Sequence, residues 1–165
     1  MLNSIDRISA WAGKGVAWLV PVLILELVYD TAARYLFNAP TEWSFDISYM
    51  LYAAIFLLAA AYTLQKDGHV RIELIYERFP PRGRAFLDCL GYIVFFYPAM
   101  AALIYYGSLF AWESWMLRET SNLSMWQPPI YPLKTVLPLA TALLILQGTV
   151  IFIRSVRTLI QGESS

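Results

Sequence analysis

The chain has 165 residues, of which 59% are hydrophobic and 15% are charged, and its twelve basic side chains balance its twelve acidic ones. This balance excludes a protein that binds nucleic acid through overall positive charge, so no nucleic-acid partner is expected. The apolar content exceeds the roughly 45–50% of a soluble domain and what a core of this size encloses, so the sequence predicts an all-α protein integral to a membrane.

The first predicted transmembrane helix covers residues 15–37 and carries Glu26, Asp30 and Arg34 at four-residue spacing on one helical face. Asp30 and Arg34 have the spacing of an ion pair near the outer end of the helix. Glu26 is expected near mid-depth, where a carboxylate needs a partner, a proton or burial against another chain. A signal peptide is the competing interpretation of the N-terminus, but no small-residue cleavage site follows the apolar core.

The second predicted transmembrane helix covers residues 45–65 and contains the uncharged run Ile47–Gln65. Asp46 opens this helix, where exposed N–H groups stabilise a carboxylate. A short amphipathic helix is then predicted over residues 70–79, lying in the inner membrane interface. Its apolar face would consist of Ile72, Ile75, Tyr76 and Phe79. A solvated loop with chance periodicity is the alternative.

The third and fourth predicted transmembrane helices cover residues 86–112 and 133–156, and contain the uncharged runs Cys89–Trp112 and Thr135–Ile153. Pro98 and Pro138 lie inside these helices and are expected to kink them. The loop between them contains the sequence "WQPPIYPLK", which is typical of an extended segment lying on the membrane surface or on a partner. The whole chain is therefore predicted to be a single membrane domain, residues 1–165.

The distribution of Lys and Arg predicts the orientation of the four helices. Nine of these residues fall in the two termini and the middle loop, and three fall on the opposite side. Because basic residues concentrate in cytoplasmic loops, both termini are expected in the cytoplasm.

The sequence offers little for catalysis. One cysteine, Cys89, and one histidine, His69, exclude an internal disulfide, a haem held by two histidines and a self-contained Cys/His zinc site. Nucleophile, nucleotide-binding and metal-spacing motifs are missing as well. The sequence therefore predicts a protein that is not an enzyme and holds no cofactor and no metal. His69 is interpreted as structural or interfacial.

The charged face of the first helix favours an assembly surface, because the other predicted helices have almost no internal charge to receive it. A larger membrane partner is therefore expected to cover this face. The alternative is a stand-alone four-helix channel or proton carrier that uses Glu26 and Asp30. A membrane enzyme or redox subunit is a third possibility, against which the single histidine and single cysteine argue.

Three segments resemble the small membrane subunit, of DctQ type, of the tripartite ATP-independent periplasmic (TRAP) transporters. They are "ARYLFNAPTEWSFDIS" (residues 33–48), "DGHVRIELIYERFP" (residues 67–80) and the later "WQPPIYPLK". The order and spacing of these segments over roughly residues 15–158 carry the resemblance. The family usually has Glu where Asp46 stands, and often has a glycine near Ala59–Ala61.

The resemblance implies a scaffold subunit of a sodium-coupled secondary transporter that imports organic acids across the bacterial inner membrane. Its partners would be a large elevator-type membrane subunit (DctM-type), a periplasmic substrate-binding protein (DctP-type) and phospholipid. The candidate residues for partner or lipid contact are Glu26, Asp30, Arg34, Trp43, Asp46, His69 and Arg71. The candidate residues for docking of the periplasmic protein are Trp115, Arg118, Glu119 and Trp126.

Overall fold

The computed structural model describes residues 2–39, 41–66 and 81–161. Four helices in these ranges are long and apolar enough to cross a bilayer, namely Ile5–Leu36, Ser44–Gln65, Gly83–Leu117 and Tyr131–Ile160. The described ranges contain no strand, and Thr120 and Pro129 form an isolated bridge. The chain is therefore an all-α membrane protein with four transmembrane helices, as the sequence predicts. The interfacial helix predicted over residues 70–79 lies outside the described residues.

The first apolar helix consists of two segments, α1 (Leu2–Ala17) and α2 (Leu19–Leu36), which are separated at Trp18. Pro21 explains the position of this break, because it lacks the N–H that would bond the carbonyl of Ala17 four residues earlier. The N–H of Trp18 instead bonds the carbonyl of Gly15 at 3.2 Å, which is the tighter spacing of a 3₁₀ turn. Helical structure thus begins well before the predicted start at residue 15.

The third apolar helix is formed by α5 (Pro81–Gly91), the π-helical segment η1 (Tyr92–Phe96) and α6 (Tyr97–Leu117). The N–H of Tyr97 bonds the carbonyl of Tyr92, five residues earlier. Pro98 follows at once and offers no N–H to the carbonyl of Val94, so the widened turn is the local response to the proline. The fourth apolar helix, α7 (Tyr131–Gln161), stays helical through Pro138.

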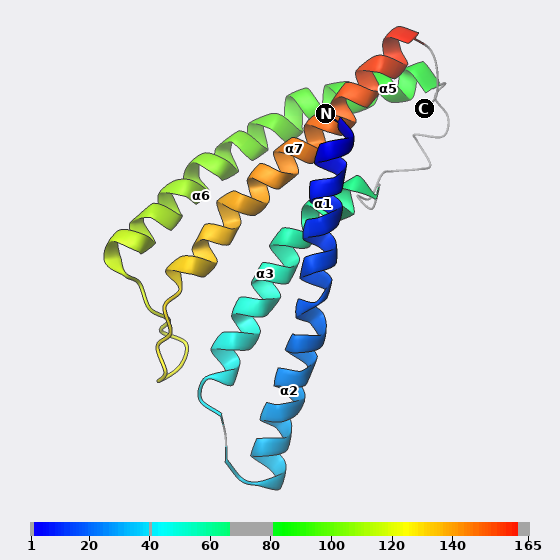
Figure 1. The fold of residues 1–165 in the computed structure, drawn as a ribbon. Helices are drawn as coiled ribbons and strands as arrows, with labels where there is room; N and C mark the ends of the chain where they lie inside the picture. Colours follow the sequence, from blue (N-terminus) through cyan, green and yellow to red (C-terminus); the bar gives the residue numbers. More distant parts are fainter. Residues whose placement is uncertain (1, 40, 67–80, 162–165) are drawn as a thin grey trace.

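The helix α7 lies at the centre of the bundle and contacts α6, α3 (Ser44–Gln65), α5 and α1. By contrast, α2 packs on α3 and continues the direction of the chain from α1. Figure 1 shows α6 and α7 side by side, with α3 beside α1 and α2, and the two pairs diverge toward the loops at residues 37–43 and 118–130. We call that end of the bundle the loop end, and the end where α1 begins and α7 ends the terminal end.

Two glycines lie where neighbouring helices approach each other closely. A Cβ atom on Gly13 of α1 would lie 2.6 Å from Cβ of Tyr62 on α3, so this crossing excludes any side chain. Gly148 of α7 similarly faces Phe96, and a Cβ there would lie 3.3 Å from Tyr92 Cε1. Small residues at such crossings are typical of helices that pack in membranes, where close backbone approach replaces the hydrophobic driving force.

Candidate functional site

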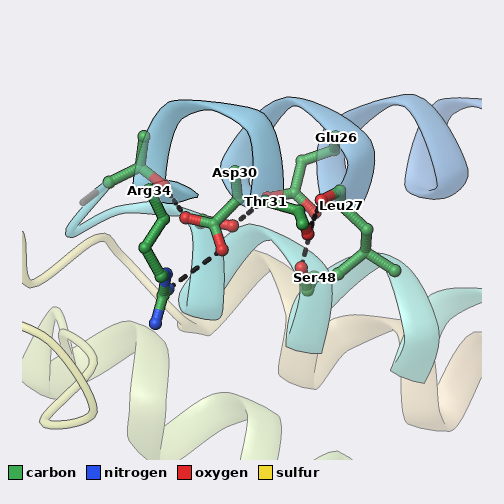
Figure 2. Close-up of polar contacts among 8 residues, drawn as sticks. Glu26, Leu27, Asp30, Thr31, Arg34 and Ser48 are labelled. Atoms are coloured by element: carbon green, nitrogen blue, oxygen red, sulfur yellow. Dashed lines mark hydrogen bonds and ion pairs between the residues drawn. The ribbon is translucent and has the colours of Figure 1, made fainter. Parts of the chain in front are cut away.

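Glu26 on α2 is held by two serines of α3. Its carboxylate accepts hydrogen bonds from the hydroxyl of Ser44 and, at 2.5 Å, from the hydroxyl of Ser48. Figure 2 shows Glu26 and Ser48 pointing toward each other across the two helices. The expectation that nothing in the chain receives this charge is therefore wrong, because uncharged hydroxyl groups do so. Relative to α3, Glu26 lies beside the first two turns.

Asp30 and Arg34 form the predicted ion pair, with 3.0 Å between Asp30 Oδ2 and Arg34 Nη2 (Figure 2). The hydroxyl of Thr41 donates to Asp30 Oδ1, which links α2 to the loop that leads into α3. The Arg34 side chain is 54% exposed, so the pair itself stabilises the fold by about 1 kcal/mol at most. The ion pair and Thr41 therefore fix the conformation of the α2–α3 connection more than they add to the stability of the fold.

Asp46 is almost completely buried, with 1% of its surface exposed, and it lies in the first turn of α3. One carboxylate oxygen accepts the hydroxyl of Ser121 and the other accepts the hydroxyl of Ser124, both in the loop between α6 and α7. The two serine oxygens in turn accept the N–H groups of Leu123 and Trp126, each at 3.2 Å. Asp46 thus fastens the tip of the α6–α7 loop to the start of α3.

An ion pair between Lys134 and Glu119 closes the base of the α6–α7 loop. Lys134 of α7 donates to the carboxylate of Glu119, and its ammonium group lies 3.9 Å from the ring centroid of Phe110. The hydrogen bond from Lys134 holds the pKa of Glu119 below its ordinary value of 4.5. Beside it, the indole N–H of Trp115 donates to Thr135 at 2.8 Å. Two of the predicted docking residues, Trp115 and Glu119, therefore have contacts within the chain.

Acidification is expected to weaken the α6–α7 loop. Because the pKa of Glu119 is lowered in the folded chain, its ion pair stabilises the fold above pH 4.5 and loses this contribution as the pH falls through the folded pKa. We expect Glu119→Gln to lower the apparent unfolding temperature at neutral pH and to match the unmodified chain once the pH lies below the folded pKa of Glu119. Thermal unfolding in detergent at several pH values measures this. The exposed Glu113→Gln is the control, and an equal pH profile for both variants would contradict the assignment.

A second group of polar contacts joins the helices at the terminal end. Asp6 of α1 pairs with Arg154 of α7, and its other carboxylate oxygen accepts the amide of Gln147 at 2.9 Å. Ser9 donates to the fully buried Gln147 at 2.8 Å. The side chain of Gln65, the last residue of α3, donates to the backbone carbonyl of Asp6 at 3.0 Å. Sequence reasoning missed this group because it depends on pairs of residues far apart in the chain.

The remaining candidate residues differ in how the structure places them. Trp43 stacks on Tyr29 with 5.9 Å between ring centroids. Arg118 is exposed and ends α6 in a left-handed conformation, with φ 47°. Trp126 is half exposed at the tip of the α6–α7 loop. His69 and Arg71 lie outside the described residues. Within the described ranges, no group of three His, Cys, Asp or Glu side chains is placed to hold a metal ion.

Comparison of the sequence with known proteins identifies the family of the chain. The family profile described as the DctQ component of tripartite ATP-independent periplasmic transporters matches residues 23–158. The chain belongs to the DctQ family. A similar protein is the sialic acid TRAP transporter small permease protein SiaQ of Vibrio cholerae, which is 26% identical over 66 residues. The aligned segment covers 40% of this chain and 38% of SiaQ, so the chain matches well under half the length of that relative.

Membership of the DctQ family makes the chain the small subunit of a TRAP transporter and a multi-pass protein of the inner membrane. DctQ proteins are transporter components and not an enzyme family, in agreement with the sequence prediction. The contacts described above show how this DctQ chain arranges its charges. Glu26 and Asp30, which the sequence placed along the first helix, both lie toward the loop end, where Glu26 accepts hydroxyl groups of α3 and Asp30 contacts Arg34 and Thr41.

Proposed function

We propose that this chain is the fixed membrane scaffold of a sodium-coupled secondary transporter that imports organic acids. The observation that carries the proposal is the distribution of polar groups. In the described helices, Glu26, Asp46 and Asp6 are engaged by side chains at the ends of the bundle. The stretch of α3 between them, Tyr49–Leu64, carries no charged residue. A chain organised in this way supports a partner and does not by itself form a polar passage.

The proposed partners are a large DctM-type membrane subunit, a DctP-type periplasmic binding protein and phospholipid. The substrate class follows from the resemblance and from the name of the similar SiaQ protein, which refers to sialic acid. Both termini are proposed to lie in the cytoplasm because nine of the twelve Lys and Arg residues belong to the termini and the middle loop of the sequence. The loop end then faces the periplasm, where Trp115, Arg118, Glu119 and Trp126 are candidates for docking of the binding protein.

The candidate residues for contact with the large subunit or lipid remain Glu26, Asp30, Arg34, Trp43, Asp46, His69 and Arg71. For the described members of this set, the contacts within the chain indicate how they would act. Glu26, Asp30 and Asp46 hold the helices and loops in position, so they would shape the contact surface more than they touch the partner. Arg34 is exposed beyond its ion pair and is available to a partner or to lipid headgroups.

We expect the tagged chain to co-purify with a large membrane protein, and its deletion to abolish uptake of the transported acid. Affinity purification from native membranes and an uptake assay with labelled organic acids measure both effects. The proposal fails if the chain purifies alone and uptake of every tested acid survives the deletion.

A reconstitution experiment separates the scaffold from the stand-alone channel or proton carrier. The purified chain in liposomes is expected to conduct neither sodium nor protons. Flux that Glu26→Gln or Asp30→Asn abolishes would support the alternative and overturn the scaffold proposal.

A further inference from the structure

A cavity of about 300 Å³ lies between α3, α6 and the start of α7, where the two helix pairs diverge (Figure 1). Tyr49, Ala53 and Leu57 form its wall on α3, and because they are four residues apart they share one face of that helix. Leu133 and Leu137 contribute to the wall on α7. We call this space the α3–α7 cavity. Its walls come from this chain alone, so it does not depend on a partner subunit.

The α6–α7 loop forms a roof over the α3–α7 cavity. Residues 119–123 of the loop line the cavity, and Asp46 in the first turn of α3 accepts the hydroxyl of Ser121 in this segment. The wall on α3 starts at Tyr49, within one turn of Asp46, and ends at Leu57, about 12 Å farther along the helix. The hydrocarbon core of a bilayer is about 30 Å thick, so the cavity extends from the loop end into the apolar part of one leaflet.

The roofed end of the α3–α7 cavity is polar, and the deeper part is apolar. Among the described residues that line the cavity, Glu119 and Lys134 are the ones that carry charge, and they form the ion pair at the base of the loop. The Glu119 side chain is 38% exposed and that of Lys134 is 14% exposed. An adjacent anion and cation above an apolar wall match the chemistry of an amphiphile whose headgroup carries both charges.

Lys134 retains bonding capacity toward the cavity. An ammonium group has three N–H donors. One of them is used by Glu119, and the ammonium group also lies 3.9 Å from the ring centroid of Phe110. Among the described residues, Glu119 is the acceptor with which Lys134 forms a hydrogen bond. A further donor is therefore available to an anionic group such as a phosphate oxygen.

We propose that the α3–α7 cavity binds one phospholipid with an ethanolamine headgroup. Its phosphate accepts a hydrogen bond from Lys134, and its ammonium group donates to the carboxylate of Glu119. One acyl chain lies along Ala53, Leu57 and Leu137, where it covers apolar surface that the chain leaves open. The inference deepens the proposed function, in which phospholipid is one of the partners, by assigning it a site and a headgroup.

Charge complementarity selects this occupant over other lipids. A headgroup with only negative charge would bond Lys134 but would be repelled by the carboxylate of Glu119 beside it. A choline headgroup has a positive charge but no N–H donor for that carboxylate. An apolar side chain of another protein would fill the deeper part of the cavity and leave the charged end unused. The ethanolamine headgroup satisfies both charges at once.

Competition between lipids tests the headgroup without any substitution. The full chain is purified in a nonionic detergent, stripped of lipid and mixed with equal amounts of phosphatidylethanolamine and phosphatidylglycerol. Native mass spectrometry should detect one bound phosphatidylethanolamine, at least about fivefold above phosphatidylglycerol, because one ion pair of the headgroup is exchanged for repulsion. Retention of neither lipid, or of phosphatidylglycerol to an equal or greater extent, would overturn the inference.

Glu119→Gln tests the role of the carboxylate in the choice of headgroup. The variant removes the negative charge that repels phosphatidylglycerol and keeps Lys134, so the two lipids should be retained about equally. The exposed Glu113→Gln is the control and should keep the preference for phosphatidylethanolamine. A loss of stability alone would lower the retention of both lipids together. An unchanged ratio in Glu119→Gln would show that this carboxylate does not contact the headgroup.

Ala53→Phe tests the position of the acyl chain, because the ring would occupy the apolar part of the cavity. Retention of phosphatidylethanolamine should fall at least about tenfold. Ala101→Phe is the matched control, since Ala101 is exposed on α6 and does not line the cavity. Equal retention by the two variants, compared at temperatures where both are folded, would place the lipid elsewhere and overturn the inference. Co-purification with the large subunit is scored separately, so the proposed function and this inference can fail independently.

Discussion

Replacement of Asp46 by alanine is expected to release the α6–α7 loop from α3. The substitution removes a buried carboxylate that accepts hydrogen bonds from Ser121 and Ser124, and it leaves both hydroxyl groups without their acceptor. A hydrogen bond to a charged group contributes about 1.5–3 kcal/mol, so we expect a loss of roughly 3 kcal/mol or more in the free energy of unfolding. The apparent unfolding temperature in detergent should fall accordingly.

The same variant makes a local prediction that separates release of the loop from general destabilisation. The N–H groups of Leu123 and Trp126 are bonded to the two serines, so their hydrogen exchange should accelerate more than exchange in the middle of α3. Asp46→Glu keeps a carboxylate and should retain most of the protection. A double-mutant cycle with Ser121→Ala should be strongly non-additive. If the exchange of residues 121–126 is unchanged in Asp46→Ala, the loop is held by other contacts.

Replacement of Gly13 by alanine is expected to disrupt the crossing of α1 and α3. The new Cβ would lie 2.6 Å from Cβ of Tyr62, and that atom is fixed to the backbone of α3, so the side chain cannot rotate away. Overpacking of this kind costs about 1–3 kcal/mol. The crossing also positions Asp6 and Ser9 for their contacts with α7, so we expect those contacts to weaken at the same time. The apparent unfolding temperature of the purified chain measures the effect.

Gly15 provides a matched control for this substitution. It lies two residues along the same helix, and a Cβ there would meet nothing within 4 Å. Gly15→Ala should therefore be neutral or stabilise the helix by up to about 1 kcal/mol, because alanine has the higher helix propensity. Tyr62→Ala, combined with Gly13→Ala, should relieve part of the clash, because it removes the ring atoms and keeps Cβ. Equal unfolding temperatures for Gly13→Ala and Gly15→Ala would show that α1 shifts without cost.

The transmembrane organisation of this chain could be predicted from the sequence because it depends on local composition. Uncharged apolar runs such as Ile47–Gln65 must form helices in lipid, where every backbone group has to be bonded internally. The pair of Asp30 and Arg34 was predictable for the same reason, since residues four apart on a helix are neighbours whatever surrounds them. The family resemblance was visible in three short segments, and the match over residues 23–158 supports it.

The partners of the buried carboxylates could not be predicted, because serine and threonine hydroxyl groups give no signal in a hydropathy or charge pattern. Ser44 and Ser48 lie 18 and 22 residues from Glu26, and Ser121 lies 75 residues from Asp46. Only a pair of hydroxyl residues at four-residue spacing, at the start of an apolar helix, hinted that Glu26 has a partner within the chain.

The sequence by itself determined that this protein has four apolar helices, that it carries charge along one face of the first, and to which family it belongs. The tertiary structure decided the register of those helices. It set Glu26 beside the beginning of α3 and Asp6 beside its end. The physical reason is that helical propensity and hydrophobicity stay the same when one helix slides along another, so they cannot select one register. Register is fixed only by specific pairs of polar atoms and by close contacts such as Gly13 with Tyr62.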